Sequence, residues 1–369
     1  MNIDAVELRV VRLPLVTPFR TSQARQDERV ALLVHVSGPD GEGWADCPVG
    51  PEPSYEPEFL AGAQAVIREH LIPLLKQAHE VTAAQVRRVL APVKGHQMAK
   101  AALETAILDA ELRAKQMSLA QYLGAVRDRV PVGVSVGIPG SPAELVDQVA
   151  EYVAQGYRRI KLKIEPGWDI EPVQAVRASL GPDVALQVDA NTAYTRATAR
   201  RLRALDEFGL LLVEQPLPAD DLLGHADLAR LLSTPVCLDE SITSPETAAA
   251  ALRLGACSVM NIKPARVGGY LSARAIHDLC AAQGIPVWCG GMLETGVGRA
   301  ANLALAALEN FTLPGDISAT ARYFTQDITA PFVLDDGHIT VPRGPGTGVE
   351  ILPEVLDRLS VHREILKWS

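Results

Sequence analysis

Val-Ala-Leu-Gln-Val-Asp189, Leu-Leu-Leu-Val-Glu214 and Val-Cys-Leu-Asp239 are three short apolar runs, and each ends in a carboxylate. The carboxylates stand 25 and 25 residues apart, and stretches with helical periodicity, roughly 10 to 14 residues long, separate the runs. A repeating strand-helix unit of about 25 residues is typical of a parallel α/β barrel, in which every strand ends on the same face. The spacing therefore predicts that the three carboxylates meet around one barrel mouth.

Two lysines continue this spacing at both ends. Lys163 stands 26 residues before Asp189, and Lys263 stands 24 residues after Asp239. Lys161 lies two positions before Lys163 on the same strand, so both side chains are expected to share one face. A neighbouring ammonium disfavours a second positive charge, and we expect it to lower the pKa of Lys163 from the ordinary value of about 10.4. All three lysines are candidate catalytic residues.

The three carboxylates are candidate metal ligands. Hard oxygen donors on neighbouring strands suit an octahedral divalent ion such as Mg²⁺. One strand-end carboxylate alone would be more typical of a solvated charge or a helix cap, but three in register with lysines at the same interval favour a site. Removing the proton beside a carboxylate creates an enediolate, whose charge a metal can neutralise while a lysine takes the proton. The pattern predicts this chemistry.

Composition limits the other function classes. The chain has 369 residues, 48% of them hydrophobic and 21% charged, and a net charge of −9, which disfavours nucleic acid and anionic membranes as partners. Five cysteines without a Cys-x-x-Cys pair predict reduced core thiols rather than a disulfide framework or zinc site. The first residues lack the basic and apolar regions of a signal peptide, so a cytoplasmic location is expected.

The order of predicted elements divides the chain. Strands followed by helices at the start predict an α+β domain over residues 1–125, and alternating strands and helices predict the barrel over 126–321. The tail, 322–369, is expected to complete the first domain by packing back on its strands. The predicted elements are strands at 3–14, 29–36 and 43–47, helices at 57–77, 81–92 and 97–115, a hairpin at 332–341 turning at Asp336-Gly337, and a closing helix from about Glu354.

Several motifs resemble those of the muconate-lactonizing branch of the enolase superfamily, over nearly the whole chain. They are Lys161-Leu-Lys163, Asp189-Ala-Asn191, Glu214-Gln-Pro216, Asp239-Glu-Ser241 and Asn261-Ile-Lys263. Within this branch, four further segments resemble the N-succinylamino acid racemase / o-succinylbenzoate synthase family, namely residues 156–164, 263–269, 288–296 and 313–318.

The resemblance implies a modified (β/α)₇β barrel under a capping domain built from both chain ends. It also implies Mg²⁺ on Asp189, Glu214 and Asp239, replaceable by Mn²⁺ or Co²⁺, with no organic cofactor. Lys163 and Lys263 would stand on opposite faces of a small carboxylate substrate. The implied reactions are racemisation of N-acylamino acids and the syn-dehydration that makes o-succinylbenzoate for menaquinone biosynthesis, and the implied assembly is a homo-oligomer such as an octamer.

Other residues are candidates for supporting roles. Asn191 and Asn261 lie two positions from key residues and are expected to orient them. Gln215 and Glu240 alternate to the other face and are expected to support packing or ligand orientation. Arg266 is expected to lower the pKa of Lys263. The candidate substrate wall consists of Ser135, Gly291, Met292 and Leu293, joined by Phe19 and Tyr55 in segments 18–22 and 47–55, which resemble the family's two capping loops.

Alternatives stay open at this stage. None of the eight histidines falls on the strand-end interval, which disfavours the histidine-base branches of the superfamily. Asp316 is a single acid where dipeptide epimerases of this branch typically show Asp-x-Asp, which favours an acylated substrate over a free amine. A muconate cycloisomerase or a dipeptide epimerase remains the nearest rival. A non-enzymatic binding scaffold would have to explain both lysines as accidents.

Overall fold

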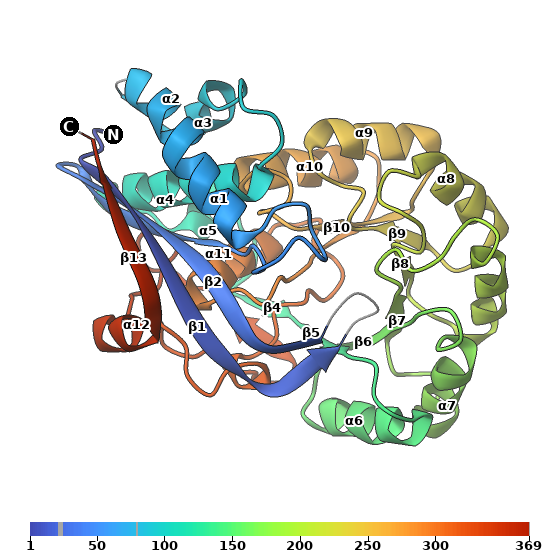
Figure 1. The fold of residues 1–369 in the computed structure, drawn as a ribbon. Helices are drawn as coiled ribbons and strands as arrows, with labels where there is room; N and C mark the ends of the chain where they lie inside the picture. Colours follow the sequence, from blue (N-terminus) through green and yellow to red (C-terminus); the bar gives the residue numbers. More distant parts are fainter. Residues whose placement is uncertain (21–24, 79, 369) are drawn as a thin grey trace.

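Seven parallel strands curl into the predicted barrel in the computed structural model, which describes residues 1–20, 25–78 and 80–368. Neighbouring strands follow chain order across the sheet, so their carboxyl ends share one rim (Figure 1). The parallel α/β class is therefore confirmed. The barrel strands are β5 (Gly133–Val136), β6 (Arg159–Lys163), β7 (Leu186–Asp189), β8 (Val213–Glu214), β9 (Val236–Leu238), β10 (Val259–Ile262) and β11 (Val287–Cys289).

A short extended segment lies between the two edge strands of this sheet. The Asp316 amide donates to Cys289 O at 2.9 Å, and the Gly133 amide donates to Gly315 O at 2.8 Å. Residues 311–316 thus connect β11 to β5 through single bridges rather than a long ladder. This contact brings Asp316 to the same rim as the other strand ends.

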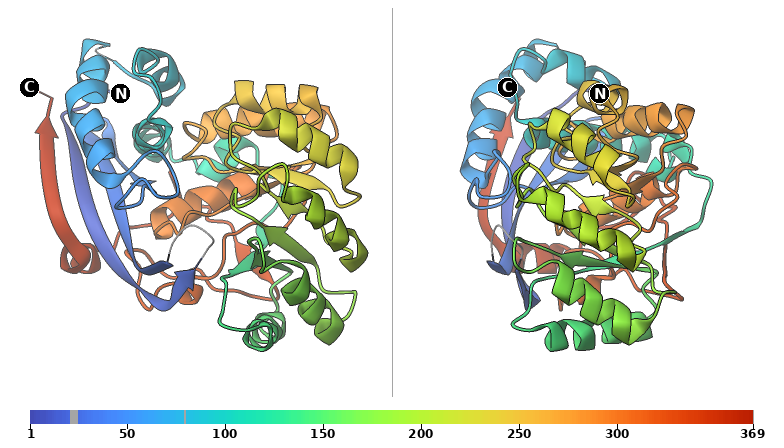
Figure 2. Two further views of the ribbon diagram at one scale, coloured as in Figure 1. Left: turned by 45° about the vertical axis from the view of Figure 1, so that its right-hand side comes forward. Right: turned by 90° about the vertical axis from the view of Figure 1, so that its right-hand side faces the viewer.

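Helices cover the outside of the barrel, as Figure 2 shows. Their starts follow ordinary capping chemistry, as in α9, where Ser244 and Thr247 form a reciprocal capping box. The barrel helices are α6 (Pro142–Ala154), α7 (Ile170–Leu180), η2 (Ala199–Phe208), α8 (Leu222–Leu231), α9 (Pro245–Leu254), α10 (Tyr270–Ala282) and α11 (Gly296–Ala306). None of the helices in the described parts of the chain combines the length and apolarity needed to cross a membrane.

The cap is an antiparallel sheet with the N-terminal helices on one face and α12 (Pro353–Leu359) on the other. Its strand order is β13-β1-β2-β3, and the two chain ends lie side by side (Figure 1), with the Trp368 amide donating to Asp4 O at 2.7 Å. The strands are β1 (Ala5–Arg20), β2 (Arg25–Gly38), β3 (Gly41–Cys47) and β13 (Ser360–Lys367), and the helices are α1 (Leu60–Val66), η1 (Ile67–Leu71), α2 (Ile72–Gln77), α3 (Ala83–Val89), α4 (Gln97–Ala114) and α5 (Leu119–Leu123).

The C-terminal tail differs from the sequence-based prediction in two places. The turn at Asp336-Gly337 forms, with φ values of 46° and 71°, but no hairpin ladder precedes it. The Phe332 backbone instead exchanges hydrogen bonds with Thr320, beside η3 (Thr320–Arg322). The strand after the turn, β12 (His338–Thr340), pairs with β4 (Arg129–Pro131). Asp335 and His338 exchange both backbone hydrogen bonds across the turn, at 2.9 and 3.0 Å. The predicted hairpin therefore reduces to this single pair and does not extend over 332–341.

The chain also ends differently from expectation. The helix α12 (Pro353–Leu359) is followed directly by β13, which pairs antiparallel with β1. The predicted closing helix is therefore not the last element. All five cysteines are buried and unpaired, as predicted.

Gly269 connects the barrel rim to the cap and provides a stability test. Its φ is 124°, and a Cβ there would overlap Glu104 Oε2. The buried Glu104 carboxylate, on α4, accepts from the Tyr270 and Leu271 amides at 2.9 and 3.0 Å and so caps α10. Gly269→Ala is expected to lower the free energy of unfolding by about 2–4 kcal/mol, from backbone strain and a displaced carboxylate.

Denaturant unfolding checks this prediction. Gly284→Ala is the matched control, because its φ is also positive, 68°, but a Cβ there meets open space. It is expected to cost only the left-handed strain of about 1–2 kcal/mol. Equal losses in the two variants would show that the Glu104 contact is not stabilising.

Candidate active site

The candidate residues lie at adjacent strand ends because the strands pair in register. Lys163 is the register partner of Asp189, and Asp189 is that of Glu214. Asp239 and Lys263 follow directly after β9 and β10. Side chains more than 70 positions apart in the chain are thereby brought to one rim.

The lysines of β6 contact the first two carboxylates. Lys163 Nζ lies 2.6 Å from Asp189 Oδ2 and donates to Asn191 Oδ1 at 2.7 Å. Lys161 Nζ lies 3.2 Å from both Asp189 Oδ2 and Glu214 Oε2, and 2.5 Å from Asp316 Oδ2. Burial lowers the pKa of Lys161, but the charges of Asp316, Glu214 and Asp189 outweigh it and hold this pKa well above its usual range.

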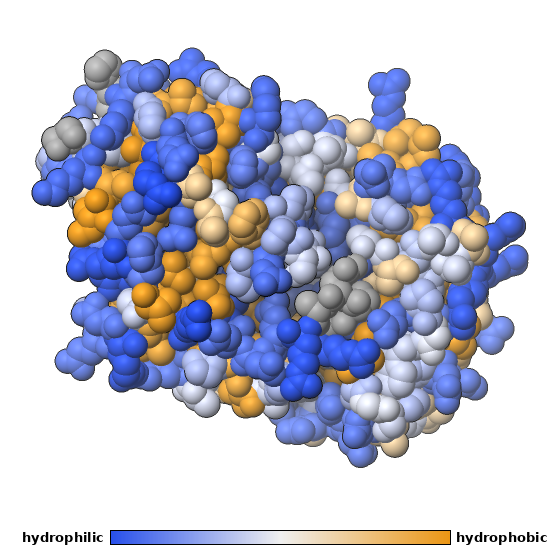
Figure 3. All heavy atoms as spheres, in the orientation of Figure 1, coloured by the Kyte–Doolittle hydropathy of each residue, from blue (hydrophilic) through white to orange (hydrophobic). Residues whose placement is uncertain are grey.

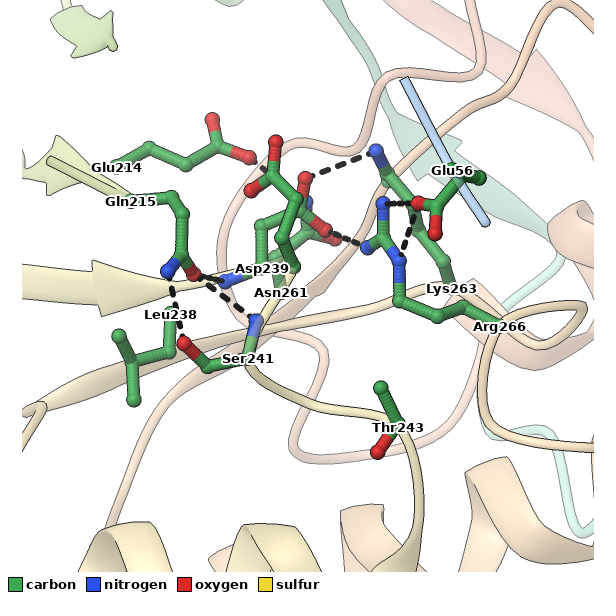
Figure 4. Close-up of polar contacts among 12 residues, drawn as sticks. Glu56, Glu214, Gln215, Leu238, Asp239, Ser241, Thr243, Asn261, Lys263 and Arg266 are labelled. Atoms are coloured by element: carbon green, nitrogen blue, oxygen red, sulfur yellow. Dashed lines mark hydrogen bonds and ion pairs between the residues drawn. The ribbon is translucent and has the colours of Figure 1, made fainter. Parts of the chain in front are cut away.

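The third carboxylate, Asp239, contacts the side chains of a lysine and an arginine (Figure 4). Lys263 Nζ lies 2.9 Å from Asp239 Oδ2 and donates to Tyr55 Oη at 2.9 Å. Arg266 forms ion pairs with Asp239 and with Glu56. Because the cap contributes Tyr55 and Glu56, these contacts join the cap to the barrel rim at the site itself.

Burial and the neighbouring charges determine the pKa values of the three carboxylates. Glu214 and Asp239 are both 0% exposed. Burial, followed by the charge of Asp189, raises the pKa of Glu214 well above its usual range. Burial also raises the pKa values of Asp189 and Asp239, but the nearby lysines, with Arg266 at Asp239, outweigh it and hold both below their usual range. Three carboxylates this close are stable only beside compensating positive charge.

The donor set fits a divalent cation by its chemistry. Three buried carboxylates with crowded charges are hard ligands whose repulsion a cation relieves. The Asn261 amide nitrogen donates to Glu214 Oε1 at 2.8 Å, while Asn261 Oδ1 is buried without a hydrogen-bond partner. As the side chains stand in the described residues, no three acidic, histidine or cysteine groups converge tightly enough to hold an ion. The carboxylate oxygens are instead paired with ammonium and guanidinium groups. An ion would replace these contacts.

A cavity of about 630 Å³ opens above the strand ends, and Figure 3 shows the surface hollowed where the cap meets the barrel. The cap supplies Phe19 and Tyr55 to its wall. Of the capping segment 18–22, residues 21 and 22 lie outside the described residues. The other predicted wall residues that line it are Ser135, Gly291, Met292 and Leu293, together with the three lysines and Asn191.

Gly290 allows the cavity wall to approach Lys263, the lysine that follows β10. A substitution there tests how Lys263 is positioned. A Cβ at residue 290 would overlap Asn261 Oδ1 and lie 2.7 Å from Lys263 Cε. Gly290→Ala is therefore expected to displace Lys263 and to lower kcat by roughly 100-fold. Steady-state kinetics and a thermal melt check this prediction together. A drop in melting temperature with unchanged kcat would contradict the positioning role.

Some predicted orientations are wrong or incomplete. Glu240 was expected to support packing or ligand orientation from the other face. Its Oε1 instead reaches the site itself and accepts from Asn191 Nδ2 at 3.0 Å, because the chain turns directly after β9. Gln215 does support the neighbouring loop, by bonding to Ser241 and the Asp239 amide. Lys161 was expected to act mainly on Lys163, and its three carboxylate contacts were not foreseen.

One acidic residue of this network, Glu56, was missed, and Asp316 was noted only for its bearing on the substrate and not as a partner of the lysines. Asp316 also pairs with Arg159 at 2.7 Å, and Glu56 pairs with Arg266. For Asp316 the available signal was its place at the last strand of the repeat. For Glu56 it was only the adjacency to Tyr55, which is a weak signal.

Comparisons with known proteins agree along the whole chain. Residues 5–124 match the mandelate racemase / muconate lactonizing enzyme N-terminal domain, and residues 144–355 match the enolase C-terminal domain-like family. An N-succinylamino acid racemase from Amycolatopsis is 59% identical over 98% of both chains. An o-succinylbenzoate synthase from Geobacillus kaustophilus is 47% identical over 98% of this chain and 96% of its own. The crystal structure of an enolase-superfamily member from Listeria innocua superposes with a TM-score of 0.96 at 39% identity, over 100% of both chains.

Proposed function

The chain belongs to the mandelate racemase / muconate lactonizing enzyme group of the enolase superfamily, and from this premise we propose a role for each side chain of the site. Enolase-superfamily enzymes remove a proton next to a carboxylate with the help of a divalent metal ion, and this chain is such an enzyme. Its activity is that of its relatives, racemisation of N-succinylamino acids and synthesis of o-succinylbenzoate.

Lys163 and Lys263 are the two acid/base groups. Lys163 extends from β6 and Lys263 follows β10, and both line one cavity while contacting different carboxylates. This two-sided placement is the observation that carries the proposal, because racemisation needs proton removal from one face of the α-carbon and proton return to the other. In each direction of reaction, one lysine accepts the α-proton and the opposite lysine donates a proton.

Asp189, Glu214 and Asp239 are proposed to hold the divalent ion, with Mg²⁺ as the preferred ion and Mn²⁺ or Co²⁺ as replacements. When bound, it would neutralise the negative charge that develops on the substrate carboxylate. Asn191 and Asn261 orient Lys163 and Glu214 through their hydrogen bonds. Lys161 adds a fixed positive charge beside the carboxylates. A homo-oligomer stays a prediction from the family resemblance, and light scattering would test it.

The same residues are suited to the dehydration. Lys163 would remove the proton and then return it to the departing hydroxyl group, which would leave from the same face as water, while Lys263 would stay cationic beside the developing charge. No additional catalytic group is required for the second reaction.

The environment of Asp316 favours an acylated substrate over a dipeptide with a free amine. Its carboxylate is engaged by Arg159 at 2.7 Å and by Lys161 at 2.5 Å. Burial raises its pKa, but these two cations outweigh it and keep that pKa below its usual range. A carboxylate already paired twice is a poor partner for a substrate ammonium.

One experiment separates the reactions. The purified protein with Mg²⁺ is given a single enantiomer of an N-succinylamino acid, and optical rotation is followed to zero. The precursor 2-succinyl-6-hydroxy-2,4-cyclohexadiene-1-carboxylate is supplied in parallel, and its dehydration is followed by absorbance. Unchanged rotation from both enantiomers would exclude the racemase, whereas dehydration alone would assign only the synthase activity.

A further inference from the structure

Arg29 is a buried cation that none of the roles above uses. It lies on β2, is 4% exposed, and lines the same cavity as Lys163 and Lys263. Its Nε and Nη2 atoms are buried without hydrogen-bond partners. A guanidinium carries five donors in a fixed fork, so leaving it unbonded in the interior is costly.

The nearest acids do not satisfy it. Asp46 and Glu294 act on Arg29 through their charge, yet neither forms an ion pair with it within the described residues. Asp46 Oδ2 accepts from the Thr295 amide at 2.7 Å. Glu294 accepts from the Met292 amide at 2.9 Å and from Asn302 at 3.0 Å. These oxygens hold the loop after β11 in place, and the Nε and Nη2 donors of Arg29 are left without an acceptor.

The other guanidinium groups along this cavity differ from Arg29. Arg12 is 57% exposed at its side chain and lies 3.4 Å from Glu28, and Arg25 pairs with Asp27 at 3.2 Å. Arg299 donates to Ser318 O and Glu294 O. Arg29 is the cavity-lining guanidinium without a partner among the residues described, and it is the one positioned to bind an anion.

The relatives indicate which anion. N-succinylamino acid racemase and o-succinylbenzoate synthase are named for molecules that share one chemical group, a succinyl chain that ends in a carboxylate. Such a molecule is a dicarboxylate, with one carboxylate beside the reacting carbon and another at the end of the chain. Arginine binds carboxylates through two parallel hydrogen bonds, which adds geometric specificity to the charge.

We propose that Arg29 binds the distal carboxylate of the succinyl chain, so that one cap residue selects succinylated substrates for both reactions. The proposal rests on the proposed function. The lysines enter the cavity from the barrel and Arg29 enters it from β2 of the cap. A dicarboxylate would therefore bridge the two domains, with its reacting carbon at the barrel rim and its tail at the cap.

Paired substrates test the subsite. Wild-type protein and Arg29→Gln are compared on an N-succinylamino acid and on the N-butanoyl derivative of the same amino acid, whose tail lacks the carboxylate. Losing a charge-assisted contact predicts a roughly 10- to 100-fold rise in KM for the succinyl substrate. The KM for the butanoyl substrate should change by less than about threefold. Arg29→Lys should retain part of the preference, and Arg230→Gln, at an exposed side chain on α8 outside the cavity lining, should leave both KM values unchanged.

Binding without turnover separates this proposal from the proposed function. Calorimetry compares o-succinylbenzoate with o-butanoylbenzoate on wild type, Arg29→Gln and Arg29→Lys, each checked by thermal melting. A preference for the succinyl ligand that disappears in Arg29→Gln supports the subsite even if racemisation fails. Equal losses for both ligands, or no preference in wild type, would overturn it and leave Arg29 as a structural partner of Asp46 and Glu294.

Discussion

Lys163→Ala and Lys263→Ala are each expected to lower the rate of N-succinylamino acid racemisation by roughly 10²- to 10⁴-fold. Each lysine serves one face of the α-carbon in the proposed mechanism, so neither can replace the other. The fold should survive, because Lys161 remains 3.2 Å from Asp189 in the first variant and Arg266 remains paired with Asp239 in the second. Polarimetry at saturating substrate measures the loss, and circular dichroism verifies folding.

Lys115→Ala is the matched control, because this side chain is exposed at the end of α4 and is not part of the cavity lining. It should racemise at the wild-type rate. Near-normal turnover in either Lys163→Ala or Lys263→Ala would show that the two-base assignment is wrong.

Asp189→Asn and Glu214→Gln should lose both metal affinity and activity. Each removes one of three buried negative charges, and a neutral amide is a weaker ligand for a hard divalent ion. Changes to residues that only support metal ligands cost 10- to 100-fold in affinity, so a ligand itself should cost at least roughly 100-fold. Titration calorimetry with Mg²⁺ and activity after treatment with a chelator measure the effect.

Asp183→Asn is the control for this series, because Asp183 is exposed and lies before β7, at the opposite end from Asp189. It should bind Mg²⁺ as wild type does. Full metal affinity in both Asp189→Asn and Glu214→Gln would place the ion elsewhere.

The barrel could be predicted because its signal is repeated and local. Each strand end adds another apolar run at the same interval, and register pairing such as Lys163 with Asp189 follows from parallel strands of similar length. The same repetition made the lysines and carboxylates recognisable as one group before their contacts were known.

The contacts that escaped prediction depend on tertiary pairing. The strand β13 is mostly polar and exposed, as is typical of an edge strand, and only its ladder with β1 gives it strand structure. Phe332 lies outside a ladder because Thr320, twelve residues earlier, takes its backbone hydrogen bonds. Glu240 points into the site because β9 ends at Leu238 and the alternation of faces along a strand no longer applies to residue 240. None of these partners is visible from local periodicity.

Deuterium exchange at the α-carbon tests the two-base account most directly. In D₂O with Mg²⁺, wild type should introduce deuterium into both enantiomers of an N-succinylamino acid while racemising them. Lys163→Ala should exchange the α-proton of one enantiomer only, Lys263→Ala that of the other only, and neither should change optical rotation, because a single lysine can remove and return a proton on its own face. Exchange of both enantiomers by either variant, or of neither by wild type, would contradict the account.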